Sequence, residues 1–251
     1  MIYLYDGSYH GFLSVVYANY YEKRAIEVFV SEDSPGIFLD ESKEIATDTE
    51  KARKVEKAFA EKCGATVAGW LYYAFHSKEP QKDTWLLRFM ELAFRLERGA
   101  ENALSETMVS RVHDLARRVS RERHSFLGFV RFEEVLSGRE KYLYSRIEPE
   151  NDVLPLMGRH FAERFYQEKI VIHDSRRKKA LIAYEGEWQI CPFSVRWQDI
   201  RQYHSGKEKD FQRLWQGYFE HIAIEERISK KRQQQFVPLK YRDHLTEFHT
   251  I

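Results

Sequence analysis

The spacing of the apolar residues changes near residue 123, and this change limits the folds that the chain can adopt. Before it, apolar residues recur every three or four positions over residues 83–96 and 105–122, which is typical of amphipathic helices. After it, short apolar runs alternate with glycine-containing turns, which is typical of hairpins. Segregated helices and strands indicate the α+β class. We therefore expect an antiparallel sheet of hairpins packed with helices, with a helical hairpin inserted in the middle of the chain.

The expected elements can be assigned along the chain. Strands are expected over 2–5 and 26–30, around a helix over 9–21. Asp48 and Gly64 have the residue types that begin and end a helix, and Asp83 is expected to cap the next one. One further helix is expected over 154–166. Further strands are expected over 126–135, 141–148, 170–174, 180–184 and 188–191. The last long helix is expected to bury a wide apolar face formed by Phe211, Leu214, Trp215, Tyr218, Phe219 and Ile222.

The length of the chain, 251 residues, is enough for one large core. The sequence contains no repeat of 20–50 residues and no stretch with the composition of a linker. We expect a single α+β domain over residues 1–251. Its parts would be a helical subregion at about 48–122, a strand-rich core at about 123–193 and a C-terminal helical region at about 194–251.

Charge is distributed unevenly, although the net charge is only +1. Residues 1–66 contain 8 Lys/Arg and 12 Asp/Glu, whereas residues 227–242 contain six basic residues and no acidic one. This asymmetry favours contact between the later part of the chain and nucleic acid or another anionic partner, although solvated charged faces are common.

The two cysteines, Cys63 and Cys191, are far apart in the sequence and neither lies in a CxxC motif. This usage fits a reducing compartment and excludes a zinc site built on cysteines. The first residues do not have the pattern of a signal peptide, and no apolar run approaches the length of a membrane span. We expect a cytoplasmic protein that does not enter a membrane.

Basic and aromatic side chains alternate in residues 123–132, which we interpret as the start of a strand. An acidic loop and a helix with further basic residues follow. Unpaired charges among apolar residues are costly, so we place the function in this part of the chain. The residues expected to contact phosphates are Arg123, Arg131, Arg164, Arg176 and Arg177. Phe126, Phe129 and Trp188 are the candidates for base stacking. The basic run over residues 176–179 fits a phosphate grip and an ordinary solvated loop equally well.

Titratable residues around the same hairpin and helix favour an alternative, which is catalysis. The candidate catalytic residues are His124, Glu148, Asp152, His160 and His173. Adjacent strand residues point to opposite faces, so Asp174 is expected to begin a turn instead of orienting the imidazole of His173. The pairs His160/Glu163 and His221/Glu225 have helical spacing that could hold a divalent metal, but we favour plain hydrogen-bonded pairs, since such spacing arises often by chance. We expect no metal and no cofactor.

Several segments resemble a known family when they are taken together. They are Tyr5-Asp6-Gly7-Ser8, Thr47-Asp48-Thr49-Glu50-Lys51-Ala52, residues 123–132, residues 148–164, His173-Asp174 with Arg176-Arg177, and residues 215–238. They resemble the bacterial "probable DNA metabolism protein" family, domain of unknown function 4130, over nearly the whole chain. The resemblance implies a role in DNA repair or DNA modification, in association with a radical SAM protein of DNA repair. It implies no catalytic residue. The chain lacks the cysteine triad of a radical SAM enzyme, so that chemistry would reside in the partner.

Three functions follow from these observations. We favour a DNA repair or DNA modification protein that acts as an accessory or DNA-binding partner of a radical SAM enzyme. The first alternative is a stand-alone enzyme that acts on a nucleic-acid base or a phosphodiester through histidine and carboxylate chemistry. The second is a structural adaptor without catalysis, whose histidines and arginines form buried hydrogen-bond networks.

Overall fold

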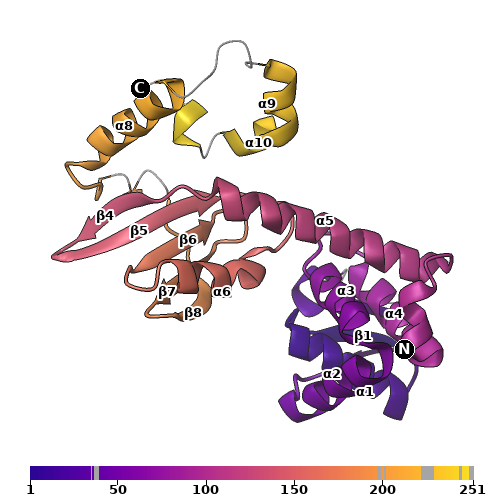
Figure 1. Ribbon diagram of the computed structural model, residues 1–251. Helices are drawn as coiled ribbons and strands as arrows, with labels where there is room; N and C mark the ends of the chain where they lie inside the picture. The colour runs from indigo at the N-terminus through magenta and orange to yellow at the C-terminus, as the bar shows by residue number, and fades with distance from the viewer. Residues whose placement is uncertain are drawn as a thin grey trace. The chain divides into compact units, whose positions relative to one another are not determined.

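A computed structural model of the chain separates it into two compact units, Met1–Arg121 (unit 1) and Glu122–Ile251 (unit 2) (Figure 1). The structure describes residues 1–34, 36, 40–196, 199–200, 202–221, 229–242 and 245–248. The single domain expected from the sequence therefore corresponds to two compact units. Their boundary lies next to the expected border between the helical subregion and the strand-rich core.

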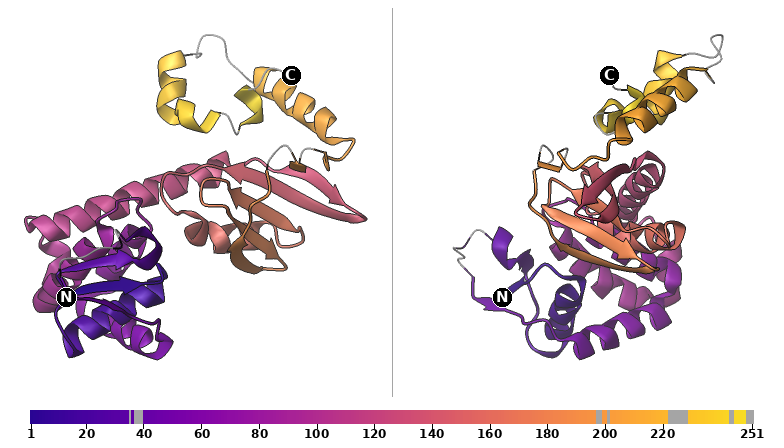
Figure 2. Two further views of the ribbon diagram at one scale, coloured as in Figure 1. Left: turned by 180° about the vertical axis from the view of Figure 1, so that it is seen from behind. Right: turned by 90° about the vertical axis from the view of Figure 1, so that its left-hand side faces the viewer.

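Unit 1 contains a parallel sheet of three strands, with β1 (Ile2–Tyr5) between β2 (Glu27–Val30) and β3 (Ser42–Glu44). The strands can be followed from behind in Figure 2. The helix α1 (Tyr9–Tyr21) returns the chain to the starting end of β1 before β2 begins, as a parallel pair requires. The expected elements over 2–5 and 9–21 are confirmed, and the strands of this first sheet are parallel because of the helical crossover, whereas hairpins would make them antiparallel.

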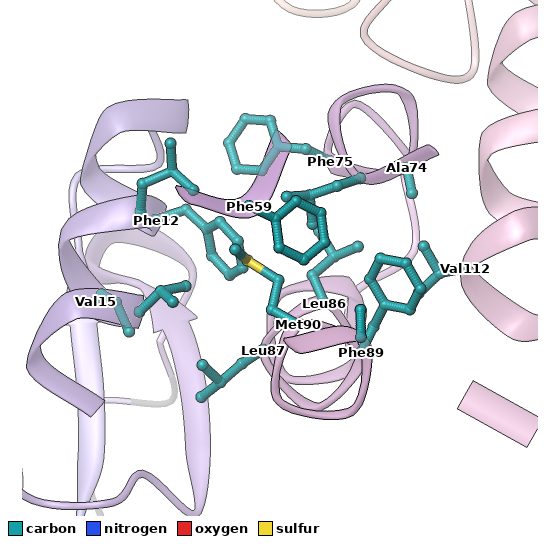
Figure 3. Packing of buried hydrophobic residues seen from close by; sticks show 14 of the residues in the cluster. Phe12, Val15, Phe59, Ala74, Phe75, Leu86, Leu87, Phe89, Met90 and Val112 are labelled. Carbon is teal, nitrogen blue, oxygen red and sulfur yellow. The ribbon is translucent and has the colours of Figure 1, made fainter. Parts of the chain in front are cut away.

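The remaining helices of unit 1 surround an apolar core. They are α2 (Thr49–Cys63), α3 (Ala65–Phe75), α4 (Lys82–Leu96) and the first part of α5 (Thr107–Phe129), with short 3-10 helices at Ser31–Asp33 and Glu97–Asn102. Figure 3 shows how Phe12, Phe59 and Phe89 meet in this core with residues from α3 and α5. The carboxylate of Asp48 accepts from the backbone N–H groups of residues 50 and 51, and Gly64 ends α2 with φ of 94°. Both expectations for α2 are thus confirmed.

The expected cap of the next helix is wrong. Gln81 occupies the N-cap position of α4, and Asp83 lies inside the first turn. The Asp83 carboxylate is buried and bonds the ammonium of Lys82 at 2.6 Å. The Asp83 carboxylate, which was expected to cap α4, is therefore paired with Lys82.

Unit 2 contains a five-stranded sheet in the order β4-β5-β6-β7-β8. The strands are β4 (Glu133–Ser137), β5 (Glu140–Ile147), β6 (Ile170–Asp174), β7 (Lys179–Tyr184) and β8 (Glu187–Pro192). The two expected hairpins, β4–β5 and β7–β8, are present and antiparallel. The pair β5–β6 is parallel because α6 (Leu154–Arg164) crosses between them, and α6 packs against β7 and β8 (Figure 1). The expected mixture of helices and sheets is confirmed.

The end of α5 corrects the interpretation of residues 123–132. These residues were expected to begin a strand, but α5 continues to Phe129 and β4 begins only at Glu133. The three- and four-residue spacing of buried side chains continues from Val119 through Glu122 to Phe126. Helical spacing therefore extends beyond the position at which basic and aromatic residues begin to alternate.

The last part of the chain contains α8 (Glu208–His221), α9 (Lys230–Phe236), α10 (Leu239–Arg242) and a 3-10 helix at Thr246–Phe248. The expected burial of the apolar face of α8 is wrong for its described side chains, since Leu214 is 69% exposed and Phe211 and Tyr218 are also exposed. The helix α8 bonds other described parts of unit 2 through Glu208 and Trp215. Most of the described apolar face of α8 is therefore not covered by those parts. The side chain of Phe219 and residues 222–228, with Glu225, lie outside the described residues.

No described helix combines the length and the hydrophobicity that crossing a membrane requires.

Candidate nucleic-acid interface

The five arginines expected to contact phosphates have different environments, and Arg131 is neutralised. Its guanidinium forms a two-point contact with Glu247, at 2.7 Å and 3.4 Å, and donates to the carbonyl oxygen of Gly128 at 2.7 Å. Burial alone would raise the pKa of Glu247, but the hydrogen bonds from Arg131 and the Trp215 indole hold this pKa below its ordinary value. The Arg131 side chain therefore joins the end of α5 to the 3-10 helix at Thr246–Phe248, and its charge is already paired.

Arg177 is also engaged within the protein. Its guanidinium bonds the buried carboxylate of Asp174 at 2.9 Å and donates to the carbonyl oxygens of Pro149 and Glu150 at 3.1 Å and 2.5 Å. The Asp174 carboxylate also accepts from the backbone N–H groups of Arg176 and Arg177, so the expected turn at Asp174 is confirmed. Arg177 therefore fixes the loop before α6, and its charge is paired with Asp174.

Arg176 has the opposite environment. Its side chain is exposed, and only its backbone N–H takes part in the turn. Neither a carboxylate nor another described group neutralises its guanidinium. Arg176 is therefore suited to the solvated phosphate contact that the sequence predicts.

Arg123 and Arg164 come together beside His160. Arg123, on α5, donates from Nε to the carbonyl oxygen of Leu156 in the first turns of α6, at 2.7 Å. Arg164 follows His160 by one helical turn and is exposed, with its guanidinium over the Phe165 ring. Neither guanidinium has a carboxylate partner among the described residues, and the nearby Glu163 instead bonds Arg159 at 2.7 Å. We call Arg123, His160 and Arg164 the α6 cationic cluster.

The electrostatics of His160 reflect this environment. Burial lowers the pKa of His160, and the charges of Arg164 and Arg123 lower it further, while Glu163 opposes them. Nε2 of His160 is buried and has no hydrogen-bond partner among the described residues, although the side chain as a whole is partly exposed. Burial and the two guanidinium groups therefore favour the neutral imidazole, and Glu163 only partly offsets them.

Three of the other candidate catalytic residues bond partners outside the candidate set. Glu148 accepts from the hydroxyl of Ser175 at 2.9 Å, and Asp152 bonds the ammonium of Lys179 at 2.6 Å. His173 is buried, with Nδ1 2.7 Å from the hydroxyl of Tyr144. His124 is exposed on α5. Glu148, Asp152 and His173 thus bond different partners, although the charge of Glu148 raises the pKa of His173 against the larger lowering by burial.

Only one of the three expected stacking residues is exposed. Phe126 is buried against the Tyr241 ring, and Phe129 contacts the same ring, because both lie on the helical face of α5 that packs against α10. The Trp188 side chain is 39% exposed and lies on α6 at Gly158, where an added Cβ would come within 2.4 Å of the indole. Trp188 therefore has one covered side and one accessible side.

Glu122, which was not among the residues expected to form the site, organises the loop before α6. Its carboxylate is buried and accepts from the backbone N–H groups of Glu150 and Asn151, both at 2.8 Å, and from Nδ2 of Asn151 at 2.6 Å. Its helical spacing from Val119 and Phe126 could have identified it, since a carboxylate on an apolar helix face needs compensating donors. This loop, residues 147–153, is also bonded by Arg177 and Lys179.

The described residues contain no group of three or more histidine, cysteine or carboxylate side chains placed to hold a metal. Of the two metal pairs considered from the sequence, His160/Glu163 has its carboxylate bonded to Arg159. The pair His221/Glu225 lies outside the side chains that the structure describes.

Comparison with known proteins gives one finding. A family model described as "Domain of unknown function (DUF4130)" matches residues 80–247. No curated protein and no solved structure was found to match the sequence. The matched range contains α4, α5, the whole sheet of unit 2 and the α6 cationic cluster. Since it covers well over half of the chain, the protein belongs to the DUF4130 family.

Proposed function

We propose that this protein is a nucleic-acid-binding accessory protein of DNA repair or DNA modification. The observation that carries the proposal is the α6 cationic cluster, in which Arg123 and Arg164 lie near one histidine without carboxylate partners among the described residues. Arginines neutralise backbone phosphates and release the counterions that surround them. Exposed Arg176 adds a further cation to unit 2.

Binding without catalysis agrees best with the geometry. His173, Glu148 and Asp152 bond separate partners, so these contacts do not pair one of them with another as acid and base. The role of the chain would be to hold DNA, and the resemblance suggests that a radical SAM partner supplies the chemistry. The accessible side of Trp188 is available for stacking with an unpaired base.

The proposal is tested by measuring the affinity of the full chain for a labelled oligonucleotide over a series of salt concentrations. Affinity should fall steeply as salt rises, with a slope in log–log form of about −0.7 per phosphate contact on single strands and about −0.9 on duplex. A protein that does not bind DNA at low salt would contradict the proposal.

A matched pair of variants locates the contact. Arg164→Gln should weaken binding for all sequences and reduce the salt slope by about one contact. Arg139→Gln removes the same charge from the exposed turn between β4 and β5 and should leave the slope unchanged. If the two variants had the same salt slope of DNA affinity, the interface would not include α6.

A further inference from the structure

The buried nitrogen of His160 is the starting observation. Buried polar atoms in proteins are nearly always hydrogen-bonded, and an exception calls for a physical reason. Nε2 of His160 has no partner among the described residues, and the imidazole is otherwise partly open to solvent. A bond from Nε2 to a ligand would be one such reason. The neighbours of His160 indicate the charge that this ligand would have.

The charged groups around His160 favour an anion. Arg164 and Glu163 lie on its own helix, and Arg123 approaches from α5. Glu163 is occupied by Arg159, so the two arginines dominate. Arg123 is held by its bond to Leu156, which uses one of the five N–H donors of the guanidinium and leaves the others for a ligand. Two guanidinium groups and an imidazole thus offer donors in three separate side chains.

We infer that the α6 cationic cluster binds a phosphate monoester, such as the terminal phosphate of a broken DNA strand, in preference to an internal phosphodiester. A monoester has about −1.5 to −2 charges at pH 7 and three strong acceptor oxygens, which match three donor side chains. An internal phosphate has a single negative charge and two non-bridging oxygens. The assignment to DNA rests on the proposed function, whereas the recognition of phosphate by the cluster does not.

Binding of the anion is coupled to the protonation of His160. In the free protein, burial and the two arginines favour the neutral form of the imidazole. A dianion at the cluster offsets the arginine charges and favours the imidazolium form, which adds a second N–H donor to the ring. The bound state therefore takes up a proton, and the pKa of His160 rises.

The first experiment compares oligonucleotides of one sequence that have a 5′-phosphate, a 3′-phosphate or no terminal phosphate, with the full chain. Phosphorylation at the preferred end should tighten binding about tenfold, which corresponds to one charge-assisted contact. Arg164→Gln should abolish this difference, and Arg139→Gln should preserve it. Equal affinity for all three oligonucleotides would overturn the inference and leave the proposed function standing.

The second experiment uses inorganic phosphate alone, so it is independent of DNA. The pKa of His160 is measured in the full chain from its imidazole NMR signals, in phosphate and in chloride at equal ionic strength. Phosphate should raise this pKa in the unmodified protein and in Arg139→Gln, but not in Arg164→Gln. A shift in phosphate without DNA binding would retain the phosphate site and remove the proposed function, and the absence of a shift would overturn the site.

Discussion

Both units bury apolar side chains, but unit 2 also holds one of its loops through buried charged groups. The core of unit 1 consists of apolar side chains from its helices and from β1 and β2, with several aromatic rings in edge contact. In unit 2, buried carboxylates and a guanidinium bond the loop over residues 147–153, through Glu122, Asp174 and Arg177. Apolar packing tolerates rearrangement better than a hydrogen-bond network does, because an unsatisfied buried group loses its full solvation. The loop precedes α6, so the network positions the α6 cationic cluster.

The largest expected effect is the loss of a core ring in unit 1. Phe59 is 1% exposed and contacts the rings of Phe89 and Phe94. Phe59→Ala should lower the free energy of unfolding by about 3–5 kcal/mol through lost transfer energy and a cavity. Hydrogen exchange resolved along the chain would measure it, and protection should fall in residues 1–121. An equal loss of protection throughout residues 147–192 would show that the two units do not differ in the way described.

A smaller effect is expected when the charge at the centre of the unit 2 network is removed. Glu122→Gln retains one oxygen but places an NH2 group against the N–H donors of Glu150 and Asn151. The expected cost is about 1.5–3 kcal/mol, as for hydrogen bonds to a charged group. Chemical denaturation measures the cost, and hydrogen exchange should show faster opening of residues 147–153.

The control for Glu122 is a carboxylate on the surface of the same unit. Glu163→Gln removes an exposed ion pair with Arg159 and should change the stability by less than about 0.5 kcal/mol. If the two variants were equally stable, the buried network would contribute no more than a surface pair, and the contrast between the units would fail.

Gly158 tests whether close packing also matters in unit 2. A Cβ on Gly158 would lie 2.4 Å from two carbon atoms of the Trp188 ring, so the indole must move. Gly158→Ala should cost about 1–3 kcal/mol, as overpacking does, and should shift the NMR signal of the Trp188 indole N–H. Gly128→Ala is the matched control, since nothing lies within 4 Å of its added Cβ. A stable variant with an unchanged indole signal would show that the contact is loose.

The sequence predicted the elements whose patterns are local. The runs over 2–5 and 170–174 became β1 and β6, and the cap at Asp48 was identified because residue type and position agree. Residues 123–129 were assigned to a strand since alternating side chains resemble one, whereas tertiary burial of Glu122 and Phe126 extends the helix. Local pattern and long-range burial disagreed there, and burial determined the structure.

The candidate site was less predictable because it depends on distant partners. Arg131 pairs with Glu247, 116 residues later in the chain, and Arg177 bonds the loop 27–28 residues before it. No spacing rule identifies such pairs, so five arginines appeared equivalent in the sequence. The structure distinguishes them by which carboxylates they meet, and that distinction separates the α6 cationic cluster from arginines that serve the fold.

The smallest expected effect is a pH dependence that originates in the buried histidine of the unit 2 sheet. Burial lowers the pKa of His173 below its ordinary value of 6.5, so the folded state binds fewer protons than the unfolded state when the pH falls below that value. The contribution of His173 to stability is therefore fully present above pH 6.5 and is lost as the pH falls toward its lowered pKa, with a slope of at most about 1.4 kcal/mol per pH unit. Denaturation midpoints measured from pH 7.5 to 5 should fall less steeply in His173→Gln than in the unmodified protein. The exposed His124→Gln should follow the unmodified profile. If His173→Gln also had the pH profile of the unmodified protein, the acid sensitivity would not originate in the buried polar groups of the unit 2 sheet.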